Sequence, residues 1–449
     1  MKSRHYKRLC ILLILLISTG ALHAQKKVWS LKDCIYYALE KNIDIRQSNL
    51  SVKESEIRLS QSKTNRIPSL SGSASTSFSW AKEQMTESNS FGDKSRKNVS
   101  SFGLSSSTTL YNGGKLQNKI READINYKGE QYSTETQKES LQLYILDAYL
   151  EILYAYENVK NDSTRIKKTQ EELNLAKERM NTGLVSLSDY LEIKSELAAE
   201  KSTITEDQGT LVTNRVTLMQ LMEFPISDDF EIEFPNIDDL INSYNEIITN
   251  TTQIYQQALK VKPQIKLAAL NVESAKINEK ITKADLYPIL SLDAGLRTGW
   301  SDQISNFSYS EQLKNQYTPS IGLNLSIPIF GDKQGKNDIK LAQLSTEKYK
   351  LDEINTKNTL RKNIEQSYVE LKTSQSKYET SKEAYNSAKE SYDVALEKFN
   401  QGIINSVDFI TIKTNLTEAE NNLLKQKFNL VFSNKKLEFY KGKSIYSLK

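Results

Sequence analysis

The sequence contains the segment MNTGLVSLSDYL at residues 180–191 and a second segment of the same design, FNQGIINSVDFI, at residues 399–410. Each has a glycine at its fourth position and an aspartate six residues later: Gly183 and Asp189 in the first, Gly402 and Asp408 in the second. Glycine readily adopts the left-handed conformation that ends a helix. Ser186 and Asn405 lie at equivalent places after the glycines, and both residue types are good helix N-caps. Both segments are therefore predicted to be turns between two helices.

The similarity of the two turns extends over most of the chain. Corresponding segments lie 219 or 220 residues apart: ALEKNIDI (38–45) and ALKVKPQI (258–265), IPSLS (67–71) and YPILS (287–291), EIKSEL (192–197) and TIKTNL (411–416). An offset this constant indicates an internal tandem duplication of a whole structural unit. The predicted repeats are 25–222 and 251–440, with an irregular connector at 223–250 and a C-terminal tail at 441–449.

Residues 1–24 have the features of an export signal. A basic start precedes the apolar run LCILLILLI, and ALHA before Gln25 offers a small-residue cleavage site. The apolar run is too short to span a bilayer as a stable helix, which needs about 20 apolar residues. We therefore expect the mature chain to begin near Gln25.

The composition of the mature chain excludes several classes of protein. All charged residues of the signal are basic, so residues 25–449 have a formal net charge of zero, which disfavours a nucleic-acid partner. Both histidines lie in the signal, so histidine-based catalysis and the usual zinc sites are excluded. Cys34 is the one remaining cysteine and cannot form an internal disulfide. We expect a protein that is not an enzyme and that binds neither metal nor cofactor.

Two very long helices are predicted at 113–180 and 333–400. Their apolar residues recur at alternating steps of three and four: Leu141, Ile145, Ala148, Ile152 and Ala155 in the first, and Tyr385, Ala388, Tyr392, Ala395 and Phe399 in the second. This spacing is typical of coiled coils, and a helix of about 68 residues is roughly 100 Å long. Shorter helices are predicted at 31–65, 188–220, 251–285 and 406–440.

Four segments alternate between apolar and small polar residues, which predicts strands. They are 69–80 and 98–110 in the first repeat, separated by a polar loop at 81–97, and 288–300 and 317–329 in the second. In SLSGSASTSFSW every odd position from Ser69 to Ser79 is serine, and in the next strand Phe102, Leu104 and Leu110 are expected on one face. The segments have the length of tilted membrane-spanning strands. A soluble antiparallel sheet lying on a core is the alternative.

The ordered set of features resembles the TolC-like outer-membrane efflux proteins over essentially all of residues 25–449. It comprises a signal, a duplication, two short hairpins and two long helices that each end in a G-x-x-x-x-x-D turn. The resemblance implies a mostly α fold with a small membrane β-part. In a homotrimer, four strands per chain would form one twelve-stranded β-barrel in the outer membrane of a Gram-negative bacterium, and the helices a periplasmic coiled-coil tunnel. It also implies a periplasmic adaptor and an inner-membrane pump as partners, and contact with outer-membrane lipid.

The resemblance places the helical turns at the periplasmic entrance of the channel. Asp408 matches an acid that rings the closed pore in that family, and Thr411 stands where a second acid is often found. Asp408 and its counterpart in the first repeat, Asp189, are therefore the candidate residues of a pore entrance gate. For Asp189, and also for Asp408, a purely structural role beside the helix N-cap is the alternative. We expect the apolar residues that follow the glycines to dock an adaptor, unless they fold back under the chain. They are Leu184 and Val185 after Gly183, and Ile403 and Ile404 after Gly402.

The leading function is therefore a passive exit channel for efflux or secretion, which conducts substrates from the periplasm to the exterior. A non-transporting coiled-coil scaffold or adhesin on the cell surface is the alternative. The serine-rich strand faces favour the channel, because a scaffold needs no polar lumen lined by small side chains. A water-filled duct selects weakly, so we expect the pump to choose among drugs, metals and polypeptides.

Overall fold

The structure is a computed structural model that describes residues 27–84, 91–242, 250–329, 333–443 and 445–446. The predicted export signal at 1–24 lies outside the described residues. The chain divides into two compact units. Unit 1 comprises Met1–Arg46, Gln137–Val261 and Leu360–Lys449, and unit 2 comprises Gln47–Thr136 and Lys262–Thr359. Each unit contains parts of both repeats, because the two long helices pass from one unit into the other.

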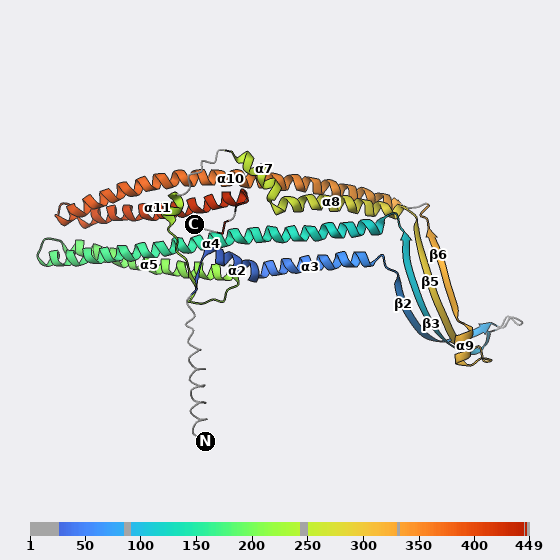
Figure 1. Ribbon diagram of the computed structural model, residues 1–449. Helices are drawn as coiled ribbons and strands as arrows, with labels where there is room; N and C mark the ends of the chain where they lie inside the picture. Colours follow the sequence, from blue (N-terminus) through green and yellow to red (C-terminus); the bar gives the residue numbers. More distant parts are fainter. Residues whose placement is uncertain (1–26, 85–90, 243–249, 330–332, 444, 447–449) are drawn as a thin grey trace, which may run out of the picture. The chain divides into compact units, whose positions relative to one another are not determined.

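Unit 1 is built mainly of helices (Figure 1). It contains α2 (Leu31–Lys41), α5 (Leu187–Met222), α6 (Ile237–Asn242), α7 (Thr251–Val261), α11 (Ser406–Tyr440) and the C-terminal parts of α4 (Lys115–Asn181) and α10 (Lys333–Asn400). Two short strands, β1 (Val28–Trp29) and β4 (Glu231–Ile232), pair in parallel. Neither strand nor α6 is predicted by the sequence, because each is too short to show a hydrophobic period.

The helices of unit 1 pair as two antiparallel hairpins. In the first hairpin, the Asn214 side chain of α5 donates a hydrogen bond of 3.2 Å to the carbonyl of Glu151 in α4. In the second, Asn422 of α11 donates to Ser381 of α10 at 3.1 Å. The rings of Tyr154 in α4 and Phe428 in α11 pack edge to face. The hairpins of the two repeats therefore pack against each other within unit 1.

The single helices predicted at 31–65 and 251–285 are each broken in two, which corrects that prediction. The first break is at Asn42, whose side-chain oxygen accepts hydrogen bonds from the backbone of Asp44 and Ile45 and so caps α3 (Ile43–Thr64). The second is at Lys262, immediately before Pro263, which begins α8 (Pro263–Lys283). A residue before proline is disfavoured in the helical conformation, because the proline ring clashes with it.

Unit 2 holds most of α3, α8, a 3-10 turn at Ala284–Leu286, the N-terminal parts of α4 and α10, and the sheet (Figure 1). The strands are β2 (Ser69–Gln84), β3 (Phe91–Tyr111), β5 (Ile289–Ser301) and β6 (Thr318–Ser326). They pair antiparallel in the order β2-β3-β5-β6. A short helix that the sequence analysis missed, α9 (Tyr309–Asn315), packs against the end of β5.

The strand register places the serines of β2 and the small polar residues of its neighbours on one face of the sheet. Ser71 pairs with Ser105 and Ser75 with Ser101, and in both pairs the hydroxyl oxygens are 2.8 Å apart. The other face is apolar and carries Leu70, Phe78, Trp80, Phe102, Leu104, Leu296, Ile321, Leu323 and Leu325. The alternation read from the sequence therefore matches the two faces of the sheet.

Three details of the strands differ from the prediction. The sheet extends into the predicted loop at 81–97, since β2 runs to Gln84 and β3 starts at Phe91. β6 ends at Ser326 rather than 329, shortly before Pro328, which has no backbone N–H for the sheet ladder. A register shift between Thr109 and Tyr111 brings Tyr111, not Leu110, opposite Leu290. The overall prediction of a mostly helical, duplicated fold with a small β-part is confirmed.

Candidate functional site at the hairpin ends

Each hairpin turns at a glycine in the left-handed conformation, with φ of 76° at Gly183 and 74° at Gly402. The next residue in each copy donates its backbone N–H to a carbonyl five residues back, Leu184 to Arg179 and Ile403 to Lys398, both at 2.9 Å. This is the Schellman motif that ends many helices. No heavy atom lies within 4 Å of a Cβ built on either glycine, so backbone conformation alone requires glycine here.

The second helix of each hairpin starts at the predicted N-cap. The Ser186 hydroxyl accepts a hydrogen bond of 3.1 Å from the backbone N–H of Asp189. The Asn405 side chain accepts one of 2.9 Å from the backbone N–H of Asp408. Both caps are confirmed, and they satisfy one of the backbone donors that every helix start leaves open.

The carboxylate of Asp189 holds the second hairpin as well as its own. It accepts hydrogen bonds from the Ser186 hydroxyl at 2.6 Å, and from the hydroxyl and backbone N–H of Ser406 at 2.6 and 3.0 Å. Ser406 is buried and belongs to the first turn of α11, where a negative charge is favourable. The hydrogen bonds from Ser186 and Ser406 hold the pKa of Asp189 below its ordinary value. We call this contact the Asp189 clasp.

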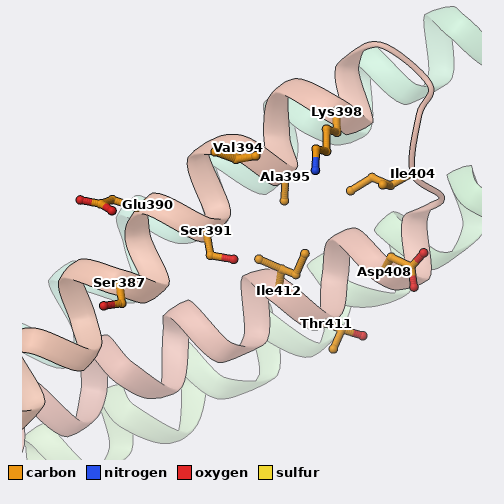
Figure 2. A pocket seen from close by; sticks show the side chains of 10 residues that line it. All are labelled: Ser387, Glu390, Ser391, Val394, Ala395, Lys398, Ile404, Asp408, Thr411 and Ile412. Carbon is orange, nitrogen blue, oxygen red and sulfur yellow. The ribbon is translucent and has the colours of Figure 1, made fainter.

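Asp408, at the equivalent place in the second repeat, is exposed. It borders an open groove of about 670 Å³ between α10 and α11, together with Lys398, Ile404 and Thr411 (Figure 2). The Thr411 hydroxyl donates to the carbonyl of Val407 in its own helix, at 2.8 Å. The duplicated aspartates therefore have different surroundings: Asp189 bonds the other hairpin, whereas Asp408 faces solvent.

The apolar residues after the glycines divide into exposed and half-buried pairs. Leu184 is 76% exposed and Ile403 65% exposed, whereas Val185 and Ile404 are half-buried. Ile404 packs against a buried cluster that we call the tip cluster: Ala176, Ile193, Tyr392, Ala395, Phe399 and Phe409. Two further apolar residues at the turns, Leu187 and Val407, are exposed and were missed by the sequence analysis, which considered only the two residues after each glycine.

The tip cluster joins all four helices of the two hairpins. Phe409 is 1% exposed, and its ring stacks on that of Phe399 with centroids 4.7 Å apart. The ring of Tyr392 also contacts that of Phe409, at a centroid distance of 5.8 Å. Burying an aromatic side chain of this size stabilises a fold by about 1.5 to 3 kcal/mol. The aromatic residue after Asp408 therefore anchors α11 against α10.

Farther from the turns, the buried Lys413 of α11 links the same four helices. Its ammonium group lies 3.0 Å from Glu172 in α4 and 3.2 Å from Glu200 in α5, and it also donates to the hydroxyl of Thr169. Tyr392 of α10 donates its hydroxyl to Glu172 at 2.8 Å. We call this set the Lys413 network. Lys413 was not among the residues singled out from the sequence.

A second buried pair, Arg165 and Asp162, adjoins the Lys413 network through Glu200. Burial raises the pKa of Asp162 to about 6, with the nearby Asp207 carboxylate adding to the rise and Arg165 opposing it. Atom Nη1 of Arg165 and Oε2 of Glu200 are buried and have no hydrogen-bond partner among the described residues. The hairpins are thus held by charges as well as by the apolar tip cluster.

The described part of the chain offers no group of three or more His, Cys, Asp or Glu side chains placed to hold a metal ion. Among its helices, none has both the length and the apolarity needed to cross a bilayer.

Comparison with known proteins identifies the class. The sequence matches the profile of the outer membrane efflux protein family over residues 34–222 and 254–443, one match in each repeat. A search of curated proteins found no significant relative. The chain belongs to the outer membrane efflux protein family. It is an outer-membrane exit channel of the kind that serves tripartite efflux systems, and a non-transporting scaffold is not favoured. The family is one of channels, not of enzymes.

Solved structures share the fold at low sequence identity. CusC, in crystal structures concerned with folding and transmembrane channel formation, has a TM-score of 0.80 at 18% identity and covers 92% of each chain. The CmeC outer membrane channel of Campylobacter jejuni has a TM-score of 0.78 at 20% identity, covering 94% of this chain and 90% of that one. The open state of the MtrE channel of Neisseria gonorrhoeae has a TM-score of 0.74 at 16% identity, covering 92% and 89%. At these identities the likeness shows the fold.

Proposed function

We propose that three copies of this chain close one β-barrel in the outer membrane and conduct solutes through it. The observation that carries the proposal is the apolar face of the sheet, where Leu70 is 76% and Ile321 77% exposed. Lipid would cover this face. Channels of the family are generally homotrimers. Four strands are too few for a barrel, since the smallest single-chain barrels have about eight.

The strand order supports this closure. The edges of the described sheet are β2 and β6, and because every neighbouring pair is antiparallel, these two strands also run in opposite directions. The β6 edge of one copy can therefore continue the antiparallel ladder onto β2 of the next. A closed barrel leaves no unpaired edge in the membrane. The serine face then lines a water-filled lumen.

Asp408 is proposed to form the pore entrance gate. Threefold symmetry would bring three exposed carboxylates around one axis, and a ring of like charges attracts cations. Asp189, the other acid of the predicted gate, is held by Ser186 and Ser406, so its proposed part is to hold the first turn of α11, which contains Asp408.

Replacing Asp408 by asparagine tests the entrance ring in planar bilayers. We expect the purified wild-type trimer to give discrete channels that Mg²⁺ blocks from the side of the helical end. The Asp408→Asn variant should need about tenfold more Mg²⁺ for half-block, which corresponds to about 1.4 kcal/mol. Asp393→Asn, an exposed acid on α10, is the control and should block like the wild type. If all three proteins need the same Mg²⁺ concentration for half-block, Asp408 does not form the proposed ring. A wild-type protein that forms no channels would refute the proposed function.

The exposed apolar residues of the turns are proposed to dock a periplasmic adaptor with helical hairpins. Leu184, Leu187, Ile403 and Val407 are large, apolar and exposed at the hairpin ends. Exposed apolar groups of this kind mark interaction sites, and a helix can lay an apolar face against them. The half-buried Val185 and Ile404 would shape the same surface from beneath. The adaptor would connect the channel to an inner-membrane pump, which chooses the cargo.

Site-specific crosslinking tests the docking surface. Cys34 is fully buried, and burial raises the pKa of its thiol to about 12, so an introduced cysteine should react alone. We expect cysteine at position 184 or 403 to crosslink to the adaptor in cells whose efflux system is active. Gln208→Cys, an exposed position within α5, serves as the control and should not crosslink. If neither turn position crosslinks in an active strain, the docking surface lies elsewhere.

A further inference from the structure

The polar face of the sheet is almost free of charge. Serine, threonine, glycine and asparagine make up most of it, and the strand register places three charged side chains among its described members: Lys97, Asp293 and Arg297. Lys97 lies opposite Ser79, toward the hairpin loop of β2 and β3. Asp293 and Arg297 lie on β5, in the middle rows of the face. Each is exposed, so its charge acts on whatever fills the space above the face.

Arg297 stands among small residues. Its direct partners across the sheet are Gly103 and Thr318, and its neighbours on the same face of β5 are Gly295 and Gly299. The side chains of these four neighbours are all much shorter than that of Arg297. Among the described residues, no carboxylate forms an ion pair with Arg297. Its guanidinium group is therefore free to offer its donors to an anionic group in water.

Asp293 lies four residues earlier on the same strand, between Ser107 and Gly322. Its carboxylate accepts a hydrogen bond of 3.2 Å from the Ser291 hydroxyl. At about 3.3 Å per strand residue, Asp293 and Arg297 are roughly 13 Å apart along the strand. This is more than a Debye length at physiological salt, so the two charges act largely as separate sites.

We propose that Arg297 and Asp293 determine the charge preference of the barrel lumen, Arg297 favouring anions and Asp293 favouring cations. The inference rests on the proposed trimeric barrel, in which each residue occurs three times around the lumen. A ring of charged side chains against a background of hydroxyls and glycines sets which ions enter. The solutes affected are small ions and the charged groups of larger solutes that pass the ring.

Reversal potentials in a KCl gradient across a planar bilayer test the proposal. At about 0.1 M salt, Arg297→Ser should raise the ratio of K⁺ to Cl⁻ permeability by at least about twofold, and Asp293→Ser should lower it by a similar factor. At about 1 M salt both shifts should shrink, because the Debye length falls from about 10 to 3 Å. Serine keeps the hydroxyl-rich character of the face, so the barrel should assemble unchanged.

Arg96→Ser is the matched control. Arg96 has the same charge but pairs with Trp80 on the apolar face, and its guanidinium lies over the ring of Phe78. Its removal should leave the permeability ratio at the wild-type value. Open channels whose ratio is unchanged in both Arg297→Ser and Asp293→Ser would overturn the inference while leaving the proposed channel intact. Absence of wild-type conductance would instead refute the proposed function.

Discussion

Replacing Lys413 by methionine is expected to destabilise the packed hairpin ends by about 3 to 5 kcal/mol. The ammonium group lies between the carboxylates of Glu172 and Glu200, and Lys413 is 5% exposed. Methionine fills a similar volume but leaves Glu172 without a cation and Glu200 with the more distant Arg165, whose Nε lies 3.9 Å from its carboxylate. A buried charge that has lost its partner cannot recover its hydration. Amide hydrogen exchange of the helices around position 413 and thermal unfolding of the trimer in detergent would measure the loss.

The duplication supplies the control for this experiment. Lys194 occupies the equivalent place in the first repeat, since EIKSEL and TIKTNL align, but it is exposed. Lys194→Met should change the free energy of unfolding by less than about 0.5 kcal/mol, as surface substitutions usually do. If both variants lose the same stability, the Lys413 network does not hold the hairpins together.

Replacing Asp189 by alanine is expected to cost about 2 to 3 kcal/mol of local stability at the turns, because hydrogen bonds to a charged group are lost and the backbone N–H of the buried Ser406 stays unpaired. The variant removes the acceptor for Ser186 and for both donors of Ser406. Ser406 can still donate its hydroxyl to Glu192, at 2.8 Å, which limits the loss. Faster hydrogen exchange in the first turns of α5 and α11 would report the loosened clasp.

Asp408→Ala is the matched control, because Asp408 has the same place after its N-cap but is exposed. Its backbone still donates to Asn405, so only a small loss is expected. A double-mutant cycle of Asp189→Ala with Ser406→Ala should show a coupling between about 0.5 and 3 kcal/mol. Additive effects of the two substitutions would mean that the Asp189 clasp contributes nothing.

The clasp also has a defined pH dependence. The folded protein lowers the pKa of Asp189 from its ordinary value of 3.8. A lowered acid pKa contributes stability at pH values above the unfolded value, and this contribution is lost as the pH falls through the folded value. The difference between wild type and Asp189→Ala should therefore be largest above about pH 4 and become smaller in stronger acid.

Much of the architecture could be predicted from the sequence. The alternation of apolar and small polar residues predicted the two faces of the sheet, because successive side chains of a strand point to opposite sides. The elements that were missed are short or depend on distant contacts. Asn42, for example, also donates its side-chain amide to the carbonyl of Leu221, so the break between α2 and α3 is fixed by a partner 179 residues away.

The two turns separate what the sequence by itself determined from what only the tertiary structure decided. Gly183 and Gly402, with the caps Ser186 and Asn405, form the same turn because backbone conformation and hydrogen bonds over a few residues suffice to make it. The different surroundings of the duplicated side chains depend on the packing of one hairpin against the other. Asp189 meets Ser406 across 217 residues, and Lys413 meets Glu172 across 241. A local pattern contains no information on such partners, so two similar motifs hold a half-buried clasp in one repeat and an exposed acid in the other.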